Sequence, residues 1–280
     1  MAQPGERPGS VGGGAGEPGT LKSAQDWRPA RILLLIYAFL GAYTVFRSIL
    51  GLPFQLWLAF LLPFVGVTFS LVHAVSGFGW RRAVIFLGLT LGLSLLLESV
   101  GVITGWVYGP YHYTARLGPL FLGSVPYLIP LTWFMMLYPS YVIAARLASR
   151  RWGPWVQLVA IAACGGLAMT AWDLVLDPLM VARSHWVWEV EGEYFGIPLH
   201  NYFGWWLTSF VILLVFGWIE MKWLPPGWER SPEFDRLAVL GYAIIGLGSI
   251  LDAIKAELVG PALAALVGMA PWAWSAWNRK

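Results

Sequence analysis

Apolar residues fill most of the chain in long runs, and short polar or glycine- and proline-rich stretches separate these runs. About 20 consecutive apolar residues let an α-helix cross the hydrocarbon core of a bilayer. The last run is short and contains Pro261, Gly268 and Pro271, so seven spans is the alternative to eight. The pattern predicts an all-α fold, a polytopic helical bundle of about eight transmembrane helices over residues 29–48, 55–76, 83–103, 125–148, 154–177, 201–223, 237–256 and 258–272.

The first segment of the chain differs from the rest. Residues 1–26 are rich in Gly, Pro, Glu and Ser and contain almost no side chain that could be buried. Such a composition cannot offset the entropy of ordering the chain, so we expect a disordered tail. Residues 27–280 are expected to form a single transmembrane helical domain.

Composition agrees with a membrane protein and excludes two other classes. The chain is 58% hydrophobic and only 12% charged, whereas about a quarter of the residues of a soluble domain are charged. A net charge of +3 with dispersed basic residues gives no patch for nucleic acid. The single cysteine, Cys164, excludes a disulfide framework and is expected to act as a small buried hydrophobe.

The basic residues indicate the orientation of the spans. The number of Lys and Arg residues in successive connections rises and falls at every step, which puts 14 of the 18 on one side of the membrane. Cytoplasmic loops are enriched in these residues. The alternation therefore predicts eight spans with both termini in the cytoplasm.

Two carboxylates interrupt the fifth apolar run. Asp173 and Asp177 are four residues apart, so they share one face of a helix. Carboxylates within a membrane cost several kcal/mol and usually mark a functional site. Pro178 follows directly, and we expect Asp177 to end its helix. Glu98 and Asp252 lie at similar depths in other spans, so we expect the four acids to converge near the outer edge of the membrane.

Aromatic residues gather in the two long connections that would cover this level, residues 104–124 and 178–200. Irregular backbone near a membrane survives where it is buried in protein or lines a cavity. We therefore expect these connections to form an aromatic lid over an acidic pocket, with Trp106, Tyr108, Tyr111, His112 and Tyr113 in one and Trp186, Trp188, Tyr194 and Phe195 in the other.

Several motifs follow one another in order between residues 98 and 206. They are Glu98-x-x-Gly101-x-x-x-Gly105-x-x-Tyr108-x-x-Tyr111-x-Tyr113, Val125-Pro126, Trp133, Trp172-Asp173-x-x-x-Asp177-Pro178, Trp186-x-Trp188, Tyr194-Phe195-Gly196-Ile197-Pro198 and Asn201-Tyr202-Phe203-Gly204-Trp205. With these motifs the chain resembles the membrane-bound carotenoid hydratases, which add water to the terminal double bond of acyclic carotenoid ends. The resemblance implies a cofactor-independent hydratase without a metal, acting on lycopene, γ-carotene or a bacterioruberin precursor in the lipid bilayer of a prokaryotic plasma membrane.

The resemblance gives the acids a role, because hydration needs a proton donor, a cation stabiliser and a group that positions water. Asp173 and Glu98 are expected to be the acid and the base, in either order. A carboxylic acid that is buried or lies beside another can stay protonated. Asp177 and Asn201 would orient the water. The substrate and its cation would be bound by Trp172, Trp186, Trp188, Tyr108, Tyr111 and Trp205.

Other polar residues have simpler interpretations. Asp252 is expected to pair with Lys255 one turn away, and Glu220 with Lys222. His73 lies far from the acids and is expected to be structural, whereas His112 is expected to be solvated or to cap a loop. Three acids of the second aromatic connection, Glu189, Glu191 and Glu193, are expected to be solvated.

Two other functions are compatible with membrane carboxylates. An intramembrane prenyltransferase would use Asp173 and Asp177 to hold Mg²⁺ and a diphosphate, but only one acid-rich motif and few nearby cations, Arg116 and Arg183, are present. A proton-coupled transporter would use Asp173, Glu98 and Asp252 as a relay. Transporters often contain internal repeats, and no convincing repeat is found between the two halves of this chain.

Overall fold

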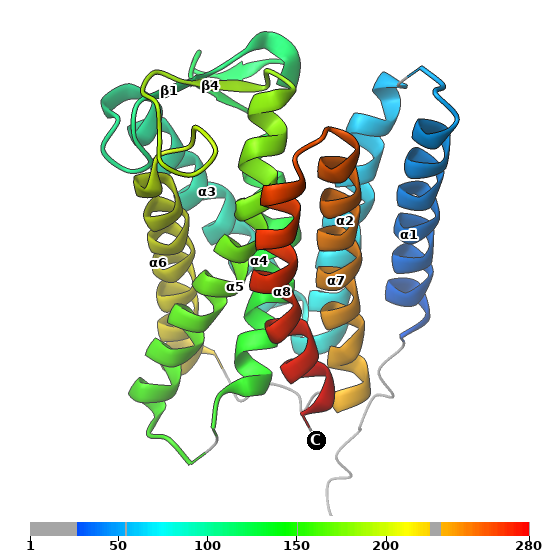
Figure 1. Ribbon diagram of the computed structural model, residues 1–280. Coiled ribbons are helices and arrows are strands. Elements are labelled where there is room, and N and C mark those ends of the chain that lie inside the picture. The colour runs from blue at the N-terminus through cyan, green and yellow to red at the C-terminus, as the bar shows by residue number, and fades with distance from the viewer. Residues whose placement is uncertain (1–26, 54, 150, 225–230, 280) are drawn as a thin grey trace, which may run out of the picture.

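In a computed structural model, eight long helices lie side by side in the part of the chain that the structure describes (Figure 1). The structure describes residues 27–53, 55–149, 151–224 and 231–279, so the tail predicted over residues 1–26 lies outside it. The helices are α1 (Arg28–Ile49), α2 (Leu56–Phe78), α3 (Trp80–Thr104), α4 (Leu128–Leu147), α5 (Pro154–Ala182), α6 (Leu199–Trp223), α7 (Pro232–Lys255) and α8 (Val259–Asn278).

All eight helices are long and apolar enough to cross a membrane. This confirms the predicted class, a polytopic all-α bundle. The eighth helix is also longer than predicted, because it continues through Pro271 as far as Asn278. The described chain begins and ends at the same end of the bundle (Figure 1), as an even number of spans requires.

Helix α4 lies at the centre of the bundle and α1 at its edge. Helix α4 contacts α2, α3, α5, α7 and α8, whereas α1 contacts mainly α2 and α7. Small residues let the helices approach closely. A Cβ atom at Gly165 of α5 would lie 2.4 Å from the Leu213 side chain of α6, and one at Gly246 of α7 would lie 2.4 Å from Met269 of α8.

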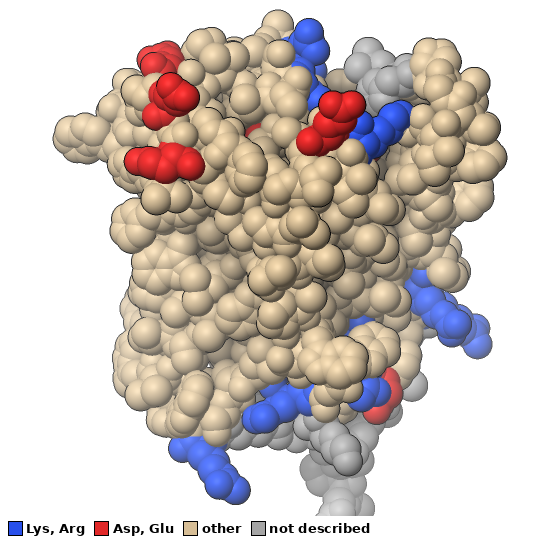
Figure 2. Space-filling view, viewed as in Figure 1, with Lys and Arg blue, Asp and Glu red and all other residues tan. Residues whose placement is uncertain are grey.

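Charged side chains gather at the two ends of the molecule on the face drawn in Figure 2, and the band between them has none. Such a band matches the apolar interior of a bilayer. At the end where the described chain begins and ends, Arg82 pairs with Glu220 at 2.9 Å, so the predicted pairing of Glu220 with Lys222 is wrong. There His73 is fully buried between the Tyr138 hydroxyl and the Phe234 carbonyl, as a structural residue would be.

Short strands cover the opposite end of the bundle (Figure 1). The strand β1 (Tyr111–Tyr113) lies in the connection between α3 and α4 and pairs with β4 (Trp186–Trp188) in the connection between α5 and α6. A second, shorter pair joins β2 (Leu120–Phe121) to β3 (Val125–Pro126). The two aromatic connections are therefore one structure, held together by pairing between strands that lie far apart in the sequence.

Candidate active site

The β1–β4 pair, called the ribbon below, presents aromatic rings to the bundle. Tyr111 lies opposite Trp188 and Tyr113 opposite Trp186 in the antiparallel register. Successive side chains of a strand point to opposite faces, so these four rings share one face. The middle pair, His112 and Val187, points outward and is exposed. The ribbon is thus an aromatic lid, as predicted for these four residues, whereas Trp106, His112 and Phe195, which were also predicted to be part of the lid, are exposed.

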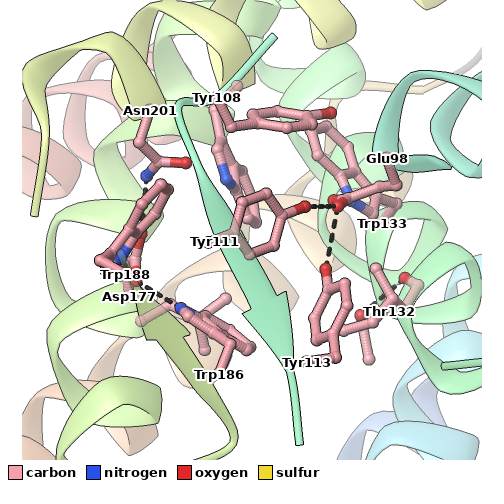
Figure 3. A pocket seen from close by; sticks show the side chains of 13 residues that line it. Glu98, Tyr108, Tyr111, Tyr113, Thr132, Trp133, Asp177, Trp186, Trp188 and Asn201 are labelled. Carbon is pink, nitrogen blue, oxygen red and sulfur yellow. Dashed lines mark hydrogen bonds between the residues drawn. The ribbon is translucent and has the colours of Figure 1, made fainter. Parts of the chain in front are cut away.

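Glu98 of α3 lies under the ribbon and is 3% exposed. Its Oε2 atom accepts hydrogen bonds from the hydroxyls of Tyr111 and Tyr113, the latter at 2.9 Å. Its Oε1 atom accepts one from the indole N–H of Trp133 on α4, at 3.0 Å. Figure 3 shows both tyrosines pointing at this carboxylate. Each carboxylate oxygen can accept two hydrogen bonds, so one acceptor position of Glu98 is left.

The two tyrosines are well suited to remain donors. Both belong to the ribbon rather than to a membrane-spanning helix. Burial, with the nearby charge of Glu98 as the second cause, raises the pKa of Tyr111 and that of Tyr113 well above the usual 10.0. Both hydroxyls therefore keep their protons at neutral pH.

Asp177 of α5 accepts hydrogen bonds from the other strand of the ribbon. The indole N–H groups of Trp186 and Trp188 donate to its Oδ1 atom at 2.6 and 3.2 Å. The side-chain amide of Asn201, in the first turn of α6, donates to its Oδ2 atom at 2.7 Å. Asp177 thus accepts three bonds, all from N–H groups.

Asn201 also joins the two aspartates. Its Nδ2 atom donates to Asp173 at 2.8 Å as well as to Asp177. Carboxylates only accept when ionised, so the amide nitrogen faces them and the amide oxygen points away from Asp177 (Figure 3). Asp173 is fully buried, and its Oδ1 atom has no hydrogen-bond partner among the described residues.

Helix α5 continues past the two aspartates, contrary to our expectation that Asp177 ends it. The helix runs to Ala182 with Pro178 inside it, and Asp177 is only 1% exposed. Proline has no backbone N–H, so the carbonyl one turn earlier, that of Leu174, loses its helical donor. The hydroxyl of Tyr194 replaces that donor at 3.0 Å. A bond from outside the helix therefore satisfies the carbonyl that Pro178 leaves without a donor.

A cavity of about 30 Å³ separates Glu98 from Asp177, large enough for one or two water molecules. The ring of Trp205 stacks on that of Trp133 at one wall, with 4.4 Å between centroids. Carboxylates, an amide and aromatic rings thus meet around a space of the size of water. The lining residues are Glu98, Tyr108, Tyr111, Tyr113, Ile129, Thr132, Trp133, Leu176, Asp177, Trp186, Trp188, Asn201 and Trp205.

Two predicted site residues do not line this cavity. Asp173 lies behind Asn201, and the indole N–H of Trp172 donates to Ser249 of α7 at 2.9 Å. Trp172 meets the edge of the Trp205 ring, with centroids 6.3 Å apart. By contrast, Tyr108 lies in the wall with its hydroxyl 2.9 Å from that of Thr208.

Asp252 does not join the other acids. It pairs with Arg183 at 3.3 Å and is partly exposed, so the predicted pairing with Lys255 is wrong. The Lys255 ammonium instead donates to the Ser48 carbonyl at 2.7 Å. Three acids converge rather than four. Among the described residues, no group of three or more His, Cys, Asp and Glu side chains is arranged to hold a metal ion.

Several lining residues were absent from the predicted site. Tyr113 and Trp133 bond Glu98 directly, and both stood in the motifs from which the resemblance was drawn. The other residues of the wall had no comparable signal, because residues of these types occur throughout an apolar helix. These are Ile129 and Thr132 near the start of α4 and Leu176 of α5.

Comparison with known proteins decides the family. The model of a family described as carotenoid biosynthesis proteins matches residues 56–271. The chain belongs to this family. A relative, the bisanhydrobacterioruberin hydratase of Haloarcula japonica, is 34% identical over 196 residues, which are 66% of this chain and 63% of the relative. The aligned part thus spans less than two thirds of that relative. No solved structure gives a significant match.

The family match includes every residue of the site. Residues 56–271 contain α2 to α7, most of α8, and both strands of the ribbon. The matched region therefore contains both the carboxylates and the aromatic rings of the candidate site.

Proposed function

We propose that this carotenoid biosynthesis protein is a hydratase, which adds water across the terminal double bond of an acyclic carotenoid end. The observation that supports this most is the water-sized cavity between Glu98 and Asp177, with aromatic rings around it. The printed name of the Haloarcula japonica relative, a hydratase, points to the same class of reaction.

Glu98 is the proton donor in this proposal. Two of its three partners are hydroxyls, and a hydroxyl can accept a hydrogen bond as well as donate one. Glu98 can therefore carry a proton on Oε2 without losing a partner. Asp177 has only N–H partners, which cannot reverse, so it acts as the ionised carboxylate.

Protonation of the less substituted alkene carbon leaves a tertiary carbocation. The faces of aromatic rings stabilise a desolvated cation by about 2 kcal/mol or more. Trp133, Trp205 and Tyr108 present such rings in the wall of the cavity. The ionised Asp177 adds an opposite charge at the other side.

Asn201 and Asp177 position the water that captures the cation. The two aspartates hold the amide nitrogen of Asn201, which leaves its oxygen as an acceptor for a water O–H. The water oxygen bonds to the cation, and its proton passes to the free acceptor position of Asp177. Return of that proton to Glu98 through cavity water completes the cycle, so no cofactor is consumed.

The cavity must enlarge to admit substrate, because the branched end of an isoprenoid chain is several times larger than a water molecule. The ribbon is the part best placed to move, since it covers the cavity and belongs to the connections rather than to the helices. The Lys and Arg distribution supports placing this end of the bundle on the non-cytoplasmic side.

The prenyltransferase alternative is not favoured. The oxygens of Asp177 already accept three N–H groups, and Asp173 accepts one. N–H donors compete with Mg²⁺ for these oxygens. A transporter is not favoured either, because Asp252 is paired away from the proposed relay.

Expression in cells that make lycopene or γ-carotene tests the proposal. We expect a pigment heavier by one water, and in D₂O one deuterium bound to the carbon beside the new alcohol. Cells that contain the Asp177→Asn variant at an equal protein level should lack the hydrated pigment. Unchanged pigment with lycopene, γ-carotene and a bacterioruberin precursor would contradict the proposal.

A further inference from the structure

Pro178 creates a defect in α5 at the turn that carries both aspartates. The carbonyl of Leu174, one residue after Asp173, has no helical donor because Pro178 has no N–H. A carbonyl without a hydrogen-bond partner is destabilising where water cannot reach it. The cost is not tolerated readily within a membrane, where water is absent. The bond from the Tyr194 hydroxyl, at 3.0 Å, removes it.

The segment Gly192–Ile197 holds Tyr194 in place. Gly192 and Tyr194 donate backbone hydrogen bonds to Gly196 and Ile197, each at 3.1 Å, and Ile197 donates to Tyr194 at 2.9 Å. A Cβ atom at Gly192 would lie 2.0 Å from the Ile197 carbonyl carbon, so only glycine fits there. The segment is therefore a tight hairpin rather than a loose loop.

A second contact fixes the hairpin to another helix. Phe195 has a φ of 50°, a conformation that is unusual for an aromatic residue. Its ring lies against Gly260 at the start of α8, where a Cβ atom would come within 2.3 Å of the ring. The Tyr194 ring also meets that of Tyr202 on α6, with 5.2 Å between centroids. Tyr194 thus contacts α5 and α6, and the hairpin that carries it is fixed to α8 through Phe195.

Tyr194 lies near the aspartates but outside the cavity. Burial and the charge of Asp173 raise the pKa of its hydroxyl to about 12, so it keeps its proton. It is absent from the cavity wall. Any effect on chemistry must therefore pass through the backbone of α5.

We propose that Tyr194 is a positioning residue, which replaces the donor lost at Pro178 and so fixes the turn from Asp173 to Asp177 in its active geometry. The catalytic part of this inference rests on the proposed hydratase function. The structural part, the exchange of one donor for another, does not.

A double-mutant cycle with Tyr194→Phe and Pro178→Ala tests the exchange. Tyr194→Phe keeps the ring and removes the donor, so kcat should fall about tenfold, with KM changed by less than about twofold because Tyr194 does not touch substrate. Alanine at position 178 returns an N–H to Leu174. In that background the same Tyr194→Phe change should lower kcat by less than about twofold.

Tyr202→Phe is the matched control, because its hydroxyl has no hydrogen-bond partner among the described residues. It should change kcat by less than about twofold. The unfolding midpoint in detergent, measured on all the variants, is the second readout. This midpoint should show the same coupling between positions 194 and 178, whichever reaction the protein catalyses.

Three results would overturn the inference. One is a loss of kcat from Tyr194→Phe that is equal whether position 178 is proline or alanine. Another is no loss of kcat or of the unfolding midpoint from Tyr194→Phe alone. The third is coupling in the midpoint while kcat is unchanged, which would remove the positioning role. If the wild type hydrates no carotenoid yet the midpoints are coupled, the proposed function fails and the donor exchange stands.

Discussion

Tyr113 and Trp186 lie opposite each other in the ribbon, yet they bond to different carboxylates. Their rings are 5.8 Å apart, with Tyr113 donating to Glu98 and Trp186 to Asp177. One strand thus holds the acid of α3 and the other the acid of α5. The ribbon therefore fixes the spacing between the two groups that we assign to proton donation and proton acceptance.

Glu98→Gln removes the proposed proton donor while keeping its size. Because general acid catalysis contributes about 10²–10⁴-fold to a rate, we expect hydrated pigment to fall by at least about 100-fold. Mass spectrometry of pigments from cells with equal protein levels measures this. Glu189→Gln, on the exposed side of the ribbon, is the control and should retain full activity. Activity of Glu98→Gln within about threefold of wild type would remove Glu98 from the mechanism.

Asp177 and Asp173 should differ when each is replaced by Asn. Asp177 lines the cavity, whereas Asp173 reaches it only through Asn201. We expect a loss of about 10²–10⁴-fold for Asp177→Asn and only about tenfold for Asp173→Asn. Initial rates of hydration in membranes compare the two. A larger loss of hydration rate from Asp173→Asn than from Asp177→Asn would indicate that Asp173 is the reacting acid or base.

A substitution at Gly204 tests the contact between α6 and the connection that follows α3. A Cβ atom there would lie 2.3 Å from the Val107 carbonyl oxygen, and backbone cannot move aside cheaply. Gly204→Ala should therefore destabilise the protein by about 1–3 kcal/mol. Gly92→Ala on α3 is the matched control, since a Cβ atom there would meet no other element of the described structure within 4 Å. Equal unfolding midpoints for the two variants in detergent would contradict the close contact.

The Tyr194 hydroxyl should make stability depend on alkaline pH. Its pKa is raised to about 12 from the usual 10.0, so folding favours the protonated form. The stabilisation is complete below pH 10 and is lost as pH rises toward 12. The difference in unfolding midpoint between wild type and Tyr194→Phe should therefore be constant from pH 7 to 9 and shrink above pH 10. A difference that grows above pH 10 would be inconsistent with this sign.

The sequence predicted the helices and the approach of Glu98, Asp173 and Asp177 to one another, because apolar length and membrane-depth acids are local signals. The lid was also predictable, as two aromatic connections. The pairing of its strands was not, since the register of Tyr111 with Trp188 depends on contacts between residues far apart in the chain. The end of α5 was misplaced because Asp177-Pro178 resembles a helix terminus. The helix instead continues through Pro178, and the hydroxyl of Tyr194, distant in the sequence, donates to the carbonyl that the proline leaves without a donor.

Ion pairs were the least predictable feature. Asp252 and Glu220 each have a lysine close by in sequence, yet each pairs with an arginine from another element, Arg183 and Arg82 respectively. Near the ends of a bundle, several cations are within reach of one carboxylate. Tertiary packing then selects the partner, and local spacing does not.

The ribbon joins two parts of the chain that each bring hydrogen-bond donors to one carboxylate. The hydrogen-bond donors to Glu98 come from residues before the link between α4 and α5, and those to Asp177 come from residues after it. The proposed reaction centre is therefore a seam between two halves of the chain, closed by one strand from each. We expect neither half to be active when made alone, and we expect the seam to close only after both halves have entered the membrane.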